Sequence, residues 1–523
     1  MTATTTSRRQ FLRSALALPI GLQALQWSTP SMASGSGDYK ALVCVFLYGG
    51  NDAYNTVLAT DSTSWGHYLA HRDPASRGQT SSTDGVIPIA LMAAGTAADP
   101  QASDLRQRLG GVLPLPASQR AEHAGRSFAL HPSLSQCASL YQAGRLAVVP
   151  NVGPLLSPTT KDDLANAAFS RPSKLYSHID QFCTWQSFRT DGAGDGWGGR
   201  MADLLCPSGL DDASLQGWRT LACMSPATEA LWLSGRDVHP YFSSPTASLT
   251  LDTQQALLAD AQVRQAVRTL MTGADSEPHL LKRALRDAQR KGLASSDLIS
   301  PLLPAQFQGP WGTPSAGSIW NDPLLQYSVL GQGGLNELAV QLQMVARLIE
   351  ANRQANLGVN RQMFFVHLYG FDTHDQQTLA HAQRLAQLDH ALAYFDQVLS
   401  AMPGGNLRNQ VTTFTSSDFG RTFTSNGDGT DHGWGGHHLV MGGAVRGGEV
   451  YGRFPTYSTA DNQGVFASPD QLANGSLLPA ISVDQYAATL GSWMGLSDTQ
   501  LLSILPNLRN FGSGVRNLGF MQA

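Results

Sequence analysis

Leu42-Val43-Cys44-Val45-Phe46-Leu47 is an uninterrupted apolar run that leads into the polar turn Gly49-Gly50-Asn51-Asp52. Such a run is typical of a strand that is buried on both faces in a parallel sheet. Three further stretches repeat the pattern: residues 146–149 before Asn151, residues 363–368 before Asp372 and residues 411–415 before Asp418. The sequence therefore predicts four buried strands, each with polar residues at its carboxyl end.

Amphipathic helices are expected between these strands. Apolar residues recur at three- and four-residue steps from Leu335 to Ile349 and again from Leu385 to Leu399, which is the spacing of a helix with one buried face. Strands that alternate with helices indicate an α/β fold with a doubly wound, mostly parallel sheet and helices on both faces. Because sheets of this kind bind ligands beyond the carboxyl ends of their strands, we expect a site there.

The domain organisation follows from where this alternation begins and breaks. We expect one α/β domain over residues 38–510. Residues 203–322 interrupt the alternation with two helical stretches and a Gly-, Pro- and Ser-rich region, so we interpret them as a helical insertion or cap.

Composition and charge exclude some classes of function. The chain has 35 Lys and Arg against 39 Asp and Glu, a formal net charge of −4, and no basic block that would neutralise the phosphates of a nucleic acid. Beyond the first thirty residues no apolar stretch reaches the roughly 20 residues that span a bilayer. We therefore expect neither nucleic-acid binding nor a stable membrane span. The chain has five cysteines, and the sequence leaves undecided whether Cys206 and Cys223 form a disulfide.

The first 33 residues have the organisation of an export signal. Arg8 and Arg9 precede an apolar segment from Ala15 to Trp27, and the small-residue site Ser31-Met32-Ala33 follows. This order predicts a twin-arginine signal peptide over residues 1–33, recognised by the twin-arginine translocation machinery, and a periplasmic or secreted protein. Because that route carries folded proteins, often with a cofactor inside, it favours a bound metal. The alternative is an ordinary basic amino terminus on a cytosolic protein.

Acids and histidines gather beyond the predicted strand ends. The candidates for metal ligands are Asp52, Asp372, His374, Asp418, Asp431 and His432. If the fold brings them together, they supply enough oxygen and nitrogen atoms for a divalent ion such as zinc, manganese, calcium or iron. Structural alternatives stay open, since Asp52 also fits a turn that bonds its own backbone and Asp372 also fits the cap of a following helix.

Two further residues are candidates for catalysis. Ser177 precedes an expected helix, and beside a metal its hydroxyl could act as a nucleophile; it also fits the N-cap of that helix. Arg421 follows the fourth strand, where it could pair with an oxygen of a phosphate or sulfate, or form a salt bridge with Asp418.

The motifs taken together resemble a bacterial family known as domain of unknown function 1501, over Leu42 to Leu496. The motifs are LVCVFLYGGNDAYNTV (42–57), RLAVVPNVG (145–153), YSHIDQF (176–182), GFDTHDQQ (370–377), SSDFGRT (416–422), GTDHGWGGHHLVMGGAVRGGEVYG (429–452) and YAATLGSWMGL (486–496). That family is similar to a remote branch of the alkaline phosphatase superfamily, which includes phosphatases, sulfatases and phosphoglycerate mutases on a doubly wound sheet with one or two metals.

This resemblance implies roles for named residues. Metal ligands are implied at Asp52, Asp372, His374, Asp418 and His432, and Ser177 is carried over with them. The chain departs from the superfamily pattern at Phe419, where a second ligand is usual and phenylalanine cannot bind a metal. The sulfatase signature Cys/Ser-x-Pro-x-Arg is not found in the sequence.

Two functions remain in view. The first is a periplasmic metal-dependent hydrolase or transferase that acts on a phosphate or sulfate ester, with the metal activating Ser177 or a water and Arg421 or a second metal stabilising the anionic transition state. The second is a protein that has kept this fold without catalysis and binds an anion, a glycan or a protein partner at the cell envelope. A stoichiometric metal is the observation that favours the first.

Overall fold

The computed structural model describes residues 39–73, 87–192, 194–228, 230–246, 260–273, 279–355 and 358–522. The predicted signal peptide, residues 1–33, lies outside the described residues. The described residues belong to one compact unit.

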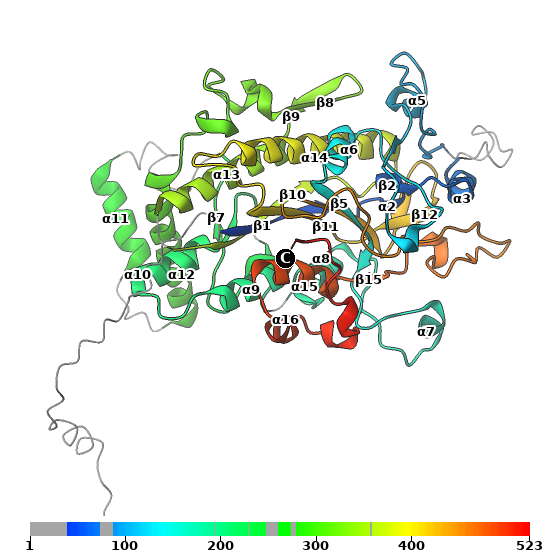
Figure 1. Cartoon of the computed structure of the whole chain (residues 1–523). Helices are drawn as coiled ribbons and strands as arrows, with labels where there is room; N and C mark the ends of the chain where they lie inside the picture. Colours follow the sequence, from blue (N-terminus) through cyan, green and yellow to red (C-terminus); the bar gives the residue numbers. More distant parts are fainter. Residues whose placement is uncertain are drawn as a thin grey trace, which may run out of the picture. The chain divides into compact units, whose positions relative to one another are not determined.

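Within these ranges an eight-stranded sheet has the order β15-β5-β14-β11-β1-β10-β6-β7 (Figure 1). The strands are β1 (Lys40–Tyr48), β5 (Leu146–Gly153), β6 (Cys223–Ser225), β7 (Tyr241–Phe242), β10 (Arg361–Tyr369), β11 (Val411–Ser417), β14 (Gly436–Met441) and β15 (Ile481–Ser482). β1 pairs in parallel with both β10 and β11, whereas β14 runs antiparallel to its neighbours β11 and β5. The sheet is mostly parallel, and the four predicted strands are confirmed as β1, β5, β10 and β11.

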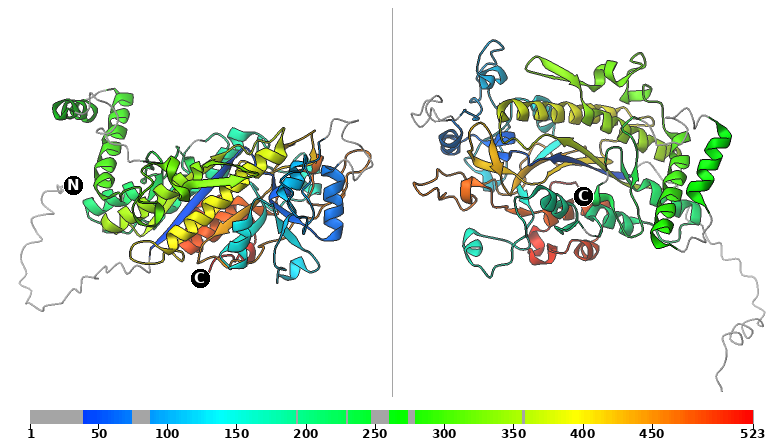
Figure 2. Two further views of the ribbon diagram at one scale, coloured as in Figure 1. Left: turned by 90° about the horizontal axis from the view of Figure 1, so that it is seen from above. Right: turned by 180° about the vertical axis from the view of Figure 1, so that it is seen from behind.

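Helices cover both faces of this sheet (Figures 1 and 2). On one face lie α6 (Ser135–Gln142), α13 (Glu337–Ala355) and α14 (Gln377–Ser400). On the other lie α8 (His178–Ser187), α9 (Trp197–Leu205), α15 (Val483–Met494) and α16 (Asp498–Ile504). The two predicted helices correspond to α13 and α14. Coverage on both sides explains why residues 41–47 of β1 are all buried and apolar.

The segment predicted as an insertion, residues 203–322, contributes to the main sheet. It contains α10 (Asp212–Leu221), β6, β7, α11 (Ala261–Thr272) and α12 (Leu280–Ile299). β6 pairs in parallel with β10, and β7 with β6, so part of the segment extends the sheet at one edge. α11 and α12 project from that edge as a pair of helices (Figure 2).

Smaller elements complete the described fold. The short helices are α2 (Ala53–Thr56), α3 (Ser62–Arg72), α5 (Leu105–Leu109) and α7 (Lys161–Ala165). The short strands are β2 (Val57–Ala59), β3 (Leu113–Pro114), β4 (Phe128–Leu130), β8 (Gln326–Val329), β9 (Gln332–Leu335), β12 (Arg421–Ser425) and β13 (Thr430–His432). They form the small sheets β2-β4-β3, β8-β9 and β12-β13.

The structure bears on two expectations from the sequence, one about a disulfide and one about membrane spans. All five cysteines are unpaired, with Cys206 partly exposed and Cys223 buried, so the disulfide that the sequence left open is not formed. Among the described residues, no helix combines the length and the apolar character that crossing a membrane requires.

Candidate metal centre

The candidate site lies beyond the carboxyl ends of three adjacent parallel strands. Gly49 follows β1, Asp372 comes after β10 and Asp418 follows β11. The Gly49 amide donates to Asp418 Oδ2 at 3.0 Å, which ties two of these strand ends together. Gly49 has a φ of +114°, and a Cβ atom there would lie 2.3 Å from the Asp372 backbone nitrogen. Only glycine fits this turn, so Gly49 allows the strand ends to converge.

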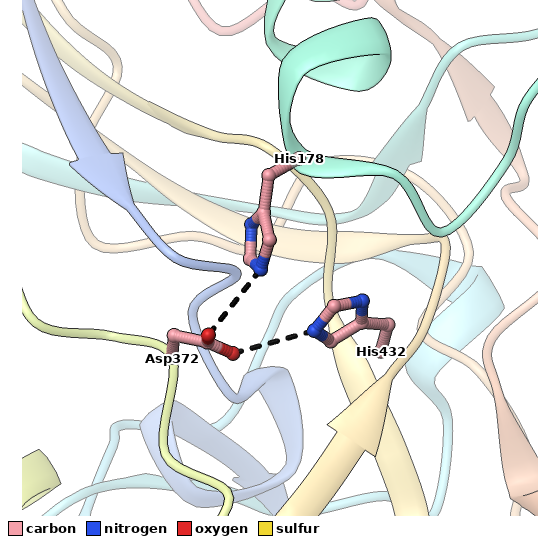
Figure 3. Close-up of side chains that lie close together, drawn as sticks. All are labelled: His178, Asp372 and His432. Carbon is pink, nitrogen blue, oxygen red and sulfur yellow. Dashed lines mark ion pairs between the residues drawn. The ribbon is translucent and has the colours of Figure 1, made fainter.

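Three side chains from distant parts of the chain point toward one another at this edge (Figure 3). His178 is the first residue of α8, Asp372 lies on the loop after β10, and His432 is the last residue of β13. One ligand atom from each lies within 4.8 Å of the others. Asp372 Oδ2 is 3.4 Å from His178 Nε2, and Asp372 Oδ1 is 3.4 Å from His432 Nε2. Two imidazole nitrogens and a carboxylate oxygen are ligand types that zinc binds in proteins.

His374 extends this group to a second side of Asp372. Its Nε2 atom is 3.0 Å from His432 Nε2 and 3.1 Å from Asp372 Oδ1. Two imidazole nitrogens at such a distance need a proton or a cation between them, because neutral ring nitrogens without hydrogen both carry lone pairs. His374 therefore adjoins the group of His178, Asp372 and His432, whose ligand atoms lie within 4.8 Å of one another, and the four residues are called the centre below.

A buried carboxylate orients His178. His178 Nδ1 lies 2.7 Å from Asp418 Oδ2, and Asp418 is 2% exposed. The hydrogen bond with Asp418 raises the pKa of His178, while burial raises the pKa of Asp418. This contact assigns a proton to Nδ1 and leaves Nε2 as the atom that faces the centre. His178 Nε2 is buried without a hydrogen-bond partner among the described residues, as expected for a metal-facing nitrogen with a carboxylate behind it.

His432 and His374 are held in a similar way. His432 Nδ1 donates to the Tyr176 carbonyl oxygen at 2.7 Å, a contact that places Nε2 toward the centre, and burial lowers the pKa of His432. His374 Nδ1 lies 3.3 Å from Asp431 Oδ1. All three histidines therefore place Nδ1 near an oxygen and Nε2 toward the centre. Asp431, which the sequence predicted to be a metal ligand, instead contacts Nδ1 of His374.

Arg421 positions Asp372. Its guanidinium is fully buried, donates to Asp372 Oδ1 at 2.6 Å and to the Gly49 carbonyl at 3.1 Å, and also bonds the Thr430 carbonyl. Burial raises the pKa of Asp372, but Arg421 outweighs it and the net pKa is lowered. The predicted salt bridge with Asp418 is replaced by one with Asp372, and because Arg421 is inaccessible to solvent we do not assign it to a substrate anion.

Asp52 lies outside the centre. Its carboxylate is fully buried and accepts two hydrogen bonds from Arg72, at 2.5 and 3.0 Å, and one from Gln377 at 2.6 Å. Burial raises the pKa of Asp52, but the Arg72 charge outweighs it and the pKa is lowered. The expectation that Asp52 converges with the other ligands is corrected by this geometry, because Arg72 occupies both of its oxygens.

Ser177 is the N-cap residue of α8. Its side chain makes no capping hydrogen bond to the helix backbone, and its hydroxyl instead donates to Asp180 Oδ2 at 2.6 Å. Ser177 thus has the predicted position at the helix start without the capping bond, and the contacts give no nucleophile aimed at Asp372. The neighbouring His178 belongs to the centre and is not among the candidates predicted from the sequence. The motif YSHIDQF (176–182), with a histidine directly after the serine, is the signal that points to it.

The centre is open to solvent on one side, where Asp372 and His374 are each a little over 40% exposed as side chains. Its second side is closed by Phe419, whose ring lies 4.8 Å from that of His178 and 4.7 Å from that of His432. An incoming molecule therefore reaches the centre from the side of Asp372 and His374.

The fold and the centre define a mixed α/β protein with a histidine–aspartate cluster at the carboxyl edge of a mostly parallel sheet. The chain belongs to the family described as protein of unknown function (DUF1501), which matches residues 39–505. This match confirms the family resemblance and spans all four residues of the centre. No curated protein matches the chain.

Proposed function

We propose that the centre binds one divalent metal ion and that the protein is a metal-dependent hydrolase of phosphate or sulfate esters. The observation that carries the proposal is that the Nε2 atoms of His178, His374 and His432 lie 3.4, 3.1 and 3.4 Å from the Asp372 carboxylate. The Nδ1 atom of each histidine lies near an oxygen on its other side. The relation to the alkaline phosphatase superfamily is part of this proposal.

The donor set favours zinc over calcium and manganese, while iron shares the preference for imidazole and carboxylate ligands. Three imidazole nitrogens and one carboxylate oxygen suit zinc, whereas calcium takes six to eight oxygen ligands and manganese prefers carboxylates, carbonyls and water. The Phe419 ring packs against His178 and His432 and brings no ligand atom, which supports one metal rather than two.

The charges around the centre are mixed in sign. Asp372 is paired with Arg421 at 2.6 Å, and the two charges of a divalent ion would be opposed by Asp418 behind His178 and Asp431 behind His374, so an anionic group would have to bind to the ion itself. When bound, zinc supplies a Lewis acid that polarises an ester oxygen and lowers the pKa of a bound water. Arg421 keeps Asp372 ionised, and Asp418 keeps the His178 Nε2 atom directed at the centre.

Binding without catalysis is the alternative that one observation favours. The Ser177 hydroxyl is engaged with Asp180 and the Arg421 guanidinium is buried, so neither a side-chain nucleophile nor a solvent-facing anion clamp is apparent from these two residues. In that case the same metal centre would hold an anion, a glycan or a protein partner at the envelope.

Elemental analysis followed by assay separates these functions. We expect one zinc per chain in the full-length protein, loss of that zinc in Asp372→Ala and His432→Ala, and retention of it in the control Asp375→Asn on the same loop. A panel of phosphate and sulfate monoesters should then give turnover that requires zinc. Zinc without turnover favours the binding function. If the protein binds no metal after it has been incubated with zinc, both functions are overturned.

We also propose that the chain is exported to the periplasm by the twin-arginine route, on the basis of Arg8 and Arg9 and the apolar segment that follows them. Replacing both arginines by lysine should retain the protein in the cytoplasm, as measured by cell fractionation, whereas Arg13→Lys should not. Equal distribution of the double variant and the wild type would contradict export by this route.

A further inference from the structure

An aromatic side chain is exposed beside the centre. Tyr369 is the last residue of β10 and stands three positions before Asp372. It is 54% exposed, whereas the preceding residues of this strand from Gln362 to Leu368 are buried. A large aromatic ring at the end of a buried strand, next to a polar centre, is a place where a ligand can gain contact area.

The inner face of the Tyr369 ring is supported. It stacks on Tyr48, the last residue of β1, with ring centroids 4.6 Å apart and an angle of 23° between the planes. Tyr48 is in turn fixed by Phe182 at 5.2 Å and His367 at 5.5 Å. Both tyrosines end paired strands and register opposite one another, and the His367 ring also contacts Tyr369, with centroids 4.5 Å apart and an angle of 68° between the planes. The Tyr369 ring is therefore held by two neighbours, and its exposed 54% is left for another molecule.

The stacked pair adjoins the centre through short connections. Tyr48 is followed by Gly49, whose amide bonds Asp418, the residue behind His178. Phe182 lies one helical turn from His178 on α8. Exposed apolar side chains continue around the same helix start, with Ile179 77% and Tyr176 41% exposed. A cluster of exposed large apolar residues around a polar centre marks a binding surface more often than chance exposure does.

We propose that the Tyr48–Tyr369 pair is a platform for a ring, so that the substrate of the function proposed above is an ester whose alcohol part has a flat apolar face. The inference rests on that proposed function. An ester held at the centre by its anionic group would lay its ring on Tyr369. A pyranose and an aryl group share this chemistry, and the experiment distinguishes them.

The test compares ring-bearing and ring-free esters with the zinc-loaded full-length protein. Tyr369→Ala should reduce the ratio of kcat/KM for hexose phosphate or phenyl phosphate over that for methyl phosphate by roughly three- to tenfold, the range expected for losing one stacking contact. Tyr369→Phe should keep the ratio, and so should Tyr327→Ala, a partly exposed tyrosine on the β8–β9 hairpin. A loss confined to the hexose ester identifies a sugar, and one confined to the phenyl ester an aryl group.

Binding measurements keep this inference separate from the proposed hydrolysis. If zinc is bound but no ester turns over, calorimetric affinities for the same three compounds should show the same change in ratio in Tyr369→Ala. An unchanged ratio in this variant, in turnover or in binding, overturns the platform while leaving the metal centre in place. A wild-type protein that binds no zinc would instead contradict the proposed function on which the inference rests.

Discussion

At the scale of single residues, Asp418 acts on the centre through His178. Its carboxylate accepts from His178 Nδ1 at 2.7 Å and is almost inaccessible to solvent. We predict that Asp418→Asn weakens zinc binding about 10- to 100-fold, because the outer carboxylate both orients the ring and makes it more basic. Competition with a coloured chelator measures this affinity. Asp375→Asn, on an exposed loop position, is the matched control, and equal affinities for both variants would contradict the role given to Asp418.

Asp52 is expected to behave as a structural residue. Its ion pair with Arg72 is fully buried, and removing one partner strands a charge in the interior. Asp52→Ala should therefore lower the free energy of unfolding by about 3–5 kcal/mol, measured by urea denaturation, without changing zinc stoichiometry in the folded protein. Glu122→Ala breaks an exposed pair with Arg120 and should cost about 1 kcal/mol or less. If Asp52→Ala lost zinc without a change in stability, Asp52 would be a metal ligand after all.

The sequence predicted some members of the centre and not others for a physical reason. Asp372, His374 and His432 follow strand ends or lie in a compact polar motif, so their grouping follows from the topology of a parallel sheet. Whether a carboxylate faces a ligand site or a cation depends on a contact that spacing does not encode, and Arg72 takes Asp52 out of the centre. The sequence did not predict His178, because its contact with Asp372 depends on the path of the chain between β5 and α8.

At the scale of elements, the long apolar strands and periodic helices were predictable, and the more polar or very short strands of the sheet were not. β1 is apolar from Ala41 to Tyr48, and β10 carries the apolar run Met363 to Val366, and such runs have few alternatives. β14 contains two buried histidines, His437 and His438, and apolar pattern alone does not fix its antiparallel direction. β6 and β7 have three and two residues, too short for any periodicity.

The turn after β1 is the element that sets the distance between strand ends. Gly49→Ala should disturb it, since the added Cβ meets the Asp372 backbone at 2.3 Å and the φ of +114° disfavours any side chain. We expect a lower melting temperature and weaker zinc binding together, because Asp372 must move. Gly95→Ala is the control, with a φ of +83° and open space around the new atom, so it should show only the conformational cost of about 1–2 kcal/mol. Equal effects of the two variants on zinc binding would contradict this account of the turn.

At the scale of the whole molecule, buried neutral histidines link folding to pH. Burial lowers the pKa of His437 and His438 to about 3 and that of His367 and His381 to about 4, against about 6.5 in an unfolded chain. Between pH 4 and 6.5 the unfolded chain thus holds more protons on these four residues, and stability is lost as pH falls. Asp484 opposes the trend, since burial raises its pKa to about 7 and the folded chain keeps one extra proton there.

These five groups together should lower the free energy of unfolding by about 3–4 kcal/mol from pH 6 to pH 5, because four histidines outweigh one aspartate at about 1.4 kcal/mol per proton and pH unit. His131, whose pKa is also lowered by burial, acts in the same direction, and Asp389 and Asp418, whose pKa values are raised by burial, act in the opposite one. Urea denaturation with a chelator present measures this fall without a contribution from zinc release. His367→Phe preserves an aromatic ring beside Tyr48 and Tyr369 and should reduce the fall by about 1 kcal/mol. A stability that is flat over this range, or an unchanged slope in His367→Phe, would show that these histidines are protonated in the folded chain and that their burial does not govern its response to acid.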